Sequence, residues 1–182
     1  MELIVHASST GPLRTGMDSI FNSFASSERQ TRAQDWLPHA TVTKTLRTLG
    51  NERAQLSSLQ VDEVCHALTQ VFMDLPRTLR TPPTISPFAV GNNWSGMSLD
   101  CPGWIVVGQE FKALISTRMN LTCEVEFRQH ISVAYGSGFD HTYHVPLASE
   151  VLNDVSLTED EWSIGLWSRI NGEWTPHIRI PW

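Results

Sequence analysis

The stretch His130-Ile-Ser-Val-Ala-Tyr135 sets the expectation for the fold. Read as a β-strand, it alternates its side chains between two faces, so His130 and Ser132 share one face. Ile131 and Val133 share the other, and two branched apolar side chains suit burial against a core. We therefore predict a strand whose open face carries an imidazole and, two residues on, a hydroxyl.

A second stretch, His39-Ala-Thr-Val-Thr43, repeats this arrangement. His39 and Thr41 share one face, and Ala40 and Val42 share the other. Each stretch follows a segment with helical spacing of apolar residues, and the two stretches lie roughly 90 residues apart. This loose duplication predicts two similar α+β lobes that face each other across a cleft, within one domain over residues 1–182.

The composition indicates a soluble globular protein and does not exclude a small anionic substrate. The chain has 182 residues, of which 41% are hydrophobic and 18% charged, and a net charge of −6. An acidic balance argues against broad coating of DNA or RNA. Three cysteines without CxxC spacing predict neither a disulfide framework nor a zinc ribbon. We expect a cytoplasmic monomer with no membrane partner, because neither a signal peptide nor a membrane span is evident.

Hydrophobic periodicity and turn residues predict the remaining elements. The pair Asn171-Gly172 predicts a hairpin turn between the last two strands. The run 103–108 is continuously apolar and is predicted to be a central strand, and 91–96 is predicted to be a turn. The other expected strands are 3–7, 37–45, 84–90, 162–167 and 174–180, and the expected helices are 16–26, 59–75, 110–121 and a short one near 147–152.

Two histidines with neighbouring hydroxyls suit the cleavage of a phosphodiester. One imidazole takes a proton from the attacking nucleophile and the other protonates the departing oxygen, which suits groups that titrate near neutrality. Hydroxyls beside them can donate to the phosphate oxygens as charge develops. We predict His39 and His130 as the catalytic pair, because the paired occurrence is far less expected by chance than either motif alone.

The two segments resemble the His-x-Thr/Ser signatures of the 2H phosphoesterase superfamily, and His130-x-Ser132-x-x-Tyr135 resembles its plant and fungal cyclic phosphodiesterase branch. The resemblance implies two pseudo-symmetric lobes with antiparallel sheets that line a central cleft, and helices outside. It also implies hydrolysis of 2′,3′-cyclic phosphates of nucleotides or RNA ends, or of ADP-ribose 1″,2″-cyclic phosphate, to a 2′-phosphate. No metal or other cofactor is implied. Thr41 and Ser132 become the phosphate-binding hydroxyls, and we favour His130 as base and His39 as acid.

Aromatic residues are weaker candidates for substrate binding. Strict alternation turns Tyr135 away from His130, so it belongs to the core unless a bulge before Gly136 returns it to the cleft. Trp94, in a polar turn, offers a stacking platform for a nucleobase, as does Phe88, although packing is the commoner role for each. The pair His141 and His144 has no evident third ligand and predicts no metal site.

Three further hypotheses stay open at this stage. The same site could act on a 2′,5′-oligoadenylate or a cyclic dinucleotide. The chain could instead bind a nucleotide or RNA end without catalysis. The two motifs could also be coincidental strands of the core.

Overall fold

The computed structural model describes residues 2–25, 30–35, 37–50, 52–136, 138–153 and 161–182. In these residues eight strands form one antiparallel sheet in the order β10-β9-β1-β2-β8-β6-β4, with β5 also paired to β6. The strands are β1 (Glu2–Thr10), β2 (Ala40–Thr43), β4 (Thr84–Ile85), β5 (Ala89–Val90), β6 (Trp94–Asp100), β8 (His130–Tyr135), β9 (Glu161–Ile170) and β10 (Glu173–Pro181). A separate pair joins β3 (Arg47–Thr48) to β7 (Leu121–Thr122).

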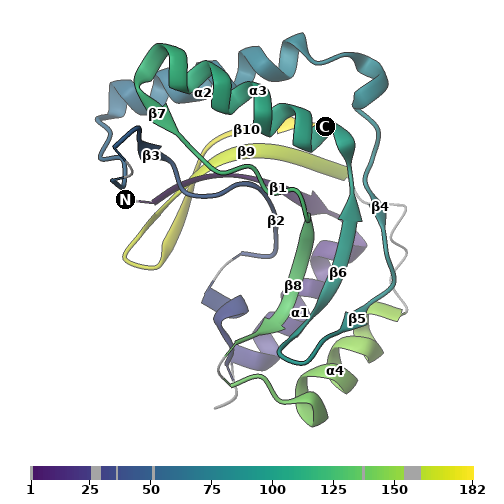
Figure 1. Cartoon of the computed structure of the whole chain (residues 1–182). Helices are drawn as coiled ribbons and strands as arrows, with labels where there is room; N and C mark the ends of the chain where they lie inside the picture. The colour runs from purple at the N-terminus through teal and green to yellow at the C-terminus, as the bar shows by residue number, and fades with distance from the viewer. Residues whose placement is uncertain (1, 26–29, 36, 51, 137, 154–160) are drawn as a thin grey trace.

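Four helices in the described residues complete an α+β fold, which confirms the expected fold class. Helices α2 (Ser58–Asp74) and α3 (Pro102–Met119) pack together against the half of the sheet that holds β10, β9 and β2 (Figure 1). Helix α1 (Pro12–Ala25) packs on β1 and β8 and against α4 (His141–Asn153). Short 3₁₀ turns lie at Arg32–Asp35 and Arg77–Leu79.

Local sequence signals explain several of these elements. Helix α2 starts with a capping box, in which the side chains of Ser57 and Gln60 bond each other's backbone N–H groups. The hairpin between β9 and β10 turns at Asn171 and Gly172, which both have positive φ, as the two-residue turn requires. The predicted strand at 130–135 is confirmed as β8.

The prediction of a strand at 103–108 is wrong, because this run is the first part of α3. Pro102 suits the first turn of a helix, where its missing N–H is tolerated. The buried residues of the helix recur every three or four positions, and the apolar run hid this period. They are Gly103, Trp104, Val107, Gly108, Phe111 and Ile115.

The segment 84–100 also differs from the prediction. The expected strand at 84–90 is two short strands, β4 and β5, and the expected turn at 91–96 gives way to β6 at Trp94. Ser95 and Gly96 are residue types typical of turns, yet both are buried in the sheet. Helix α4 begins at His141, before the short helix expected near 147–152.

The two halves of the sheet meet where β2 pairs with β8. Within the described residues this pairing consists of Ala40 opposite Ile131. Beyond it, side chains from the segment before β2 bond to the backbone of β8. The Gln34 amide nitrogen donates to the Val133 carbonyl at 2.8 Å, and the Tyr135 N–H donates to the Thr31 hydroxyl at 3.2 Å. The two strands therefore separate without leaving these groups of β8 unpaired.

We expect Gln34→Ala to lower the free energy of unfolding by about 1–2 kcal/mol, because it leaves the Val133 carbonyl without its donor in a buried strand. Urea denaturation measures the change. Gln55, which is exposed, provides the matched control, and Gln55→Ala should change stability by less than about 0.5 kcal/mol. Equal effects of the two substitutions would contradict this role of Gln34.

Candidate active site

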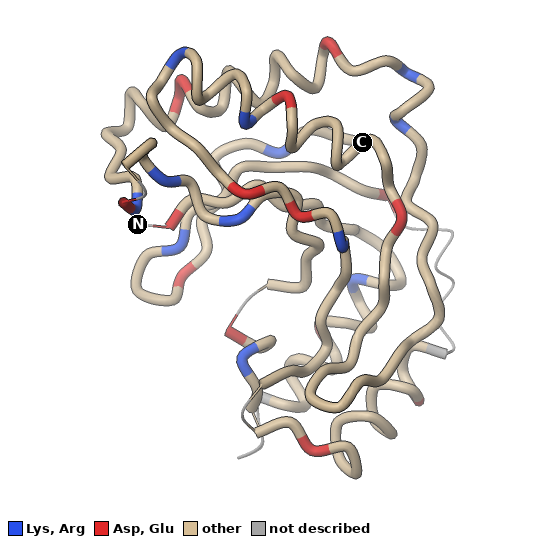
Figure 2. Tube along the Cα trace, in the orientation of Figure 1, with Lys and Arg blue, Asp and Glu red and all other residues tan. Residues whose placement is uncertain are grey.

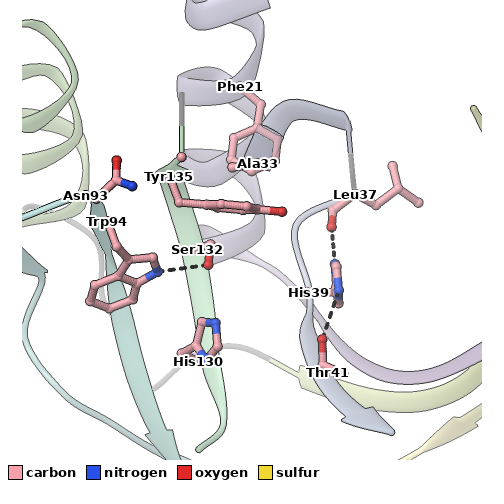
Figure 3. Close-up of a pocket in the computed structure, with 11 residues that line it drawn as sticks. Phe21, Ala33, Leu37, His39, Thr41, Asn93, Trp94, His130, Ser132 and Tyr135 are labelled. Carbon is pink, nitrogen blue, oxygen red and sulfur yellow. Dashed lines mark hydrogen bonds between the residues drawn. The ribbon is translucent and has the colours of Figure 1, made fainter. Parts of the chain in front are cut away.

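A pocket of about 460 Å³ opens where β2 and β8 separate. This volume lies within the range of small-molecule sites, about 300–1,000 Å³. All six residues that the sequence analysis assigned to catalysis or substrate binding line it (Figure 3). Its lining consists of Phe21, Ala33, Leu37, His39, Thr41, Asn93, Trp94, His130, Ser132, Tyr135 and Gly136.

The two imidazoles are held in the same way. Nδ1 of His39 lies 2.5 Å from the carbonyl oxygen of Leu37, and Nδ1 of His130 lies 2.7 Å from that of Arg128. Each carbonyl belongs to the residue two positions before its histidine. A carbonyl can only accept, so Nδ1 carries the hydrogen in both rings. This fixes the tautomer and leaves Nε2 as the nitrogen with a lone pair in the uncharged state.

A hydroxyl lies two residues after each histidine and lines the same pocket. Oγ1 of Thr41 is 3.4 Å from Nε2 of His39, which is a long and easily replaced contact. Oγ of Ser132 accepts a hydrogen bond of 2.9 Å from Nε1 of Trp94. Because the indole N–H of Trp94 occupies one lone pair of the Ser132 oxygen, the Ser132 hydroxyl can direct its own hydrogen into the pocket.

Trp94 therefore does more than provide a stacking surface. Its ring meets that of His130 edge-on, with centroids 5.8 Å apart and an interplanar angle of 84°. Gly96 makes room for it, because a Cβ there would lie 2.7 Å from the indole and 2.1 Å from the Ile131 carbonyl oxygen. The absence of a side chain at residue 96 thus lets the indole reach Ser132.

Tyr135 lies in the pocket because β8 contains a bulge. The pairing of β6 with β8 shifts by one residue between Ser95 and Gly96, and Val133 is the extra residue on β8. Val133 and Ala134 are both buried, so the alternation resumes with Tyr135 on the pocket side. The bulge that the sequence analysis required for this placement is present.

The environment of His39 favours its uncharged form. The pKa of His39 is lowered to about 4, chiefly by burial and to a smaller extent by the positive charge of His130, while the hydrogen bond with the Leu37 carbonyl opposes both effects in part. A positive charge on His130 thus disfavours protonation of His39. At neutral pH His39 is available to accept a proton.

Sequence reasoning missed several residues of the pocket and misjudged others. Phe21 and Asn93 line it, although Phe21 reads as one apolar position of a helix and Asn93 as a turn residue. Phe88, the other stacking candidate, packs against the core instead. His144 is fully buried on α4, and Nε2 of His141 contacts the carbonyl of Asn92. No three His, Cys, Asp or Glu side chains of the described ranges converge as a metal-binding group.

Comparisons with protein-family models, curated proteins and solved structures gave no match for this chain. The resemblance to the 2H phosphoesterases therefore rests on the two sequence motifs. None of the helices in the described part of the chain combines the length and apolar character needed to cross a membrane.

We expect His39 to titrate near pH 4 in NMR spectra of its ring, with the signal assigned by its loss in His39→Ala. The unfolded chain, whose histidine pKa is near 6.5, then binds more protons than the folded protein between these values. His39 alone should thus lower the free energy of unfolding by up to about 3 kcal/mol as the pH falls from 6.5 to 4, and leave it unchanged above 6.5. A titration near 6.5 would contradict the assigned environment.

Proposed function

We propose that this protein is a metal-independent phosphodiesterase that hydrolyses 2′,3′-cyclic phosphates of nucleotides or RNA ends by two-histidine acid–base catalysis. One observation carries the proposal. Two imidazoles line one pocket, each has its Nδ1 hydrogen held by the carbonyl two residues before it, and each has a hydroxyl two residues after it. This repeated geometry favours a shared site over two coincidental core strands.

In this reaction the cyclic phosphate lies between the two histidines. Uncharged His39 takes a proton from a water molecule at Nε2 as the water oxygen bonds to phosphorus. The bond from phosphorus to the ribose 3′-oxygen breaks, and protonated His130 gives its Nε2 proton to that oxygen. The product is a 2′-phosphate. Transfer of one proton from His39 to His130, through solvent or product, restores the starting state.

These roles reverse those favoured from the sequence, which took His130 as base and His39 as acid. The reversal follows from the lowered pKa of His39, because a ring that is uncharged at neutral pH accepts a proton more readily than it supplies one. A bound phosphate adds a negative charge to the pocket, which favours one protonated imidazole at the site. In the proposed mechanism that imidazole is His130.

The neighbouring hydroxyls stabilise the charge that develops on phosphorus. Thr41 and Ser132 donate to the two non-bridging oxygens, and the hydrogen bond from Trp94 keeps the Ser132 hydroxyl oriented for this. Tyr135, held in the pocket by the bulge, supplies an aromatic face and a phenolic hydroxyl for the nucleoside.

The proposal extends to the architecture and the cellular setting. The two motifs mark two pseudo-symmetric lobes whose sheets line a central cleft, and the pairing of α2 with α3 and of α1 with α4 supports this division. The protein acts on a small nucleotide or RNA end, without DNA, as a cytoplasmic monomer. Its net charge of −6 and its three free thiols, at Cys65, Cys101 and Cys123, favour this setting.

We expect the protein to open 2′,3′-cyclic nucleotides in the presence of a chelator, and His39→Ala and His130→Ala each to lower kcat/KM by about two to four orders of magnitude. Chromatography separates the 2′-phosphate from the 3′-phosphate. In the wild type, the acid limb of kcat/KM against pH should fall near pH 4, where His39 gains its proton. His66→Ala, an exposed position on α2, is the matched control and should keep full activity.

Full turnover by either active-site variant would refute the mechanism. The same assay separates the other hypotheses. Cleavage of a 2′,5′-oligoadenylate or a cyclic dinucleotide, without cleavage of 2′,3′-cyclic nucleotides, would assign the site to those substrates. Binding of a nucleoside 2′-phosphate with no turnover of any compound would assign a binding protein instead.

A further inference from the structure

A third histidine, His6, lies behind the candidate site and takes no part in the mechanism above. It belongs to β1, where it pairs with Thr41 of β2 on one side and with Gly165 of β9 on the other. Laterally paired residues of an antiparallel sheet point to the same face, so His6 and Thr41 lie on the face that carries the pocket. The ring of His6 is 1% exposed.

His6 is one member of a cluster of tilted rings that includes His39. The ring centroids of His6 and His39 are 4.7 Å apart with an interplanar angle of 35°, and those of His6 and Trp167 are also 4.7 Å apart. Beyond Trp167, the guanidinium carbon of Arg179 lies 4.6 Å from the indole centroid. The ring of His6 thus contacts both His39 and Trp167 and is buried away from solvent.

A glycine in the neighbouring strand leaves room for this cluster of rings. Gly165 lies beside His6, and a Cβ there would be 2.4 Å from the carbonyl oxygen of Ile178 and 3.0 Å from Nε1 of Trp167. The missing side chain therefore lets the indole of Trp167 lie close to the backbone beside His6. Trp174, from β10, adds a further ring with its centroid 6.1 Å from that of His6 and 6.4 Å from that of His39.

Hydrogen bonding does not explain why His6 is buried. Neither Nδ1 nor Nε2 has a partner among the described residues. A buried polar group without a partner costs stability, so an apolar ring would serve the core better. His6 instead contributes an uncharged ring that packs against His39.

We propose that His6 is a positioning residue of the active site, whose ring closes one face of His39 to water and holds that imidazole with Nε2 ready to accept a proton. This inference rests on the proposed function for its catalytic meaning, but the contact between the two rings can be tested without activity. The same ring also limits the space in which His39 could turn away from Leu37 and Thr41.

The charges around the two rings agree with this role. His39 faces His130 from β8 and His6 from β1; the positive charge of His130 lowers the pKa of His39, and a charge on His39 lowers the pKa of His6. His6 is itself kept uncharged, since burial lowers its pKa well below the usual value, and His39, Arg179 and Arg14 lower it further. His6 therefore presents an uncharged ring to His39 across the range in which enzymes usually work.

The test compares His6→Ala, which removes the ring, with His6→Phe, which keeps a ring of similar shape. NMR titration of His39 is the main readout, and thermal unfolding checks that each variant is folded. We expect His6→Ala to raise the pKa of His39 by at least about one unit from its value near 4, because water reaches the ring. His6→Phe should leave that pKa within about half a unit and raise the melting temperature, since it removes two unpartnered nitrogens.

Activity provides a second readout where the wild type cleaves a cyclic phosphate. In a plot of kcat/KM against pH, the acid limb should move to higher pH in His6→Ala and stay in place in His6→Phe. His177→Ala is the matched control, because this exposed histidine lies on β10, and it should change neither quantity. Should His6→Ala fail to fold, His6→Asn, which keeps a smaller polar side chain, takes its place.

An unchanged pKa of His39 in folded His6→Ala, or in its His6→Asn substitute, would overturn the inference. So would a loss of activity in His6→Phe, because the nitrogens of His6 would then be required. If the wild type cleaves no phosphodiester, the proposed function fails, yet the titrations still decide whether His6 shields His39.

Discussion

The candidate site depends on how two strands meet and then part. Ala40 of β2 pairs with Ile131 of β8, and this contact brings the two His-x-Thr/Ser segments to one place. On either side of the contact the strands carry their histidines and hydroxyls toward a common space. Gln34 and Thr31 form hydrogen bonds with the part of β8 that β2 does not pair with, and the pocket lies where the two strands separate. Figure 2 traces the same backbone and marks the positions of the Lys, Arg, Asp and Glu residues.

The chemistry of the pocket follows from two backbone carbonyls and one buried ring. The carbonyls of Leu37 and Arg128 each hold an imidazole through Nδ1. The two histidines therefore have little conformational freedom left to lose when a substrate binds. The surroundings then make the two rings unequal, because His39 packs against His6 and its pKa is lowered to about 4. In the proposed mechanism, this difference in environment assigns the base to His39 and the acid to His130, which is how titratable pairs commonly divide their roles.

Much of the site could be predicted from the sequence because it depends on short-range periodicity. Alternation within residues 130–135 and 39–43 places each histidine beside its hydroxyl, and the structure brings all six candidate residues into one pocket. The helix at 103–108 was missed because a run of β-branched residues favours a strand when its neighbours are ignored. The hydrogen bond from Trp94 to Ser132 and the contact of His6 with His39 could not be foreseen. Both depend on the lateral register of strands far apart in the chain, which no local pattern encodes.

The central claim is that one phosphate contacts both histidines. A crystal structure of the protein with a nucleoside 2′-phosphate, the proposed product, tests it most directly. The account predicts the phosphate between β2 and β8, with oxygens about 2.6–3.2 Å from Nε2 of His39 and of His130 and with the hydroxyls of Thr41 and Ser132 donating to it. A phosphate that contacts only one imidazole, or that binds outside this pocket, would contradict the account.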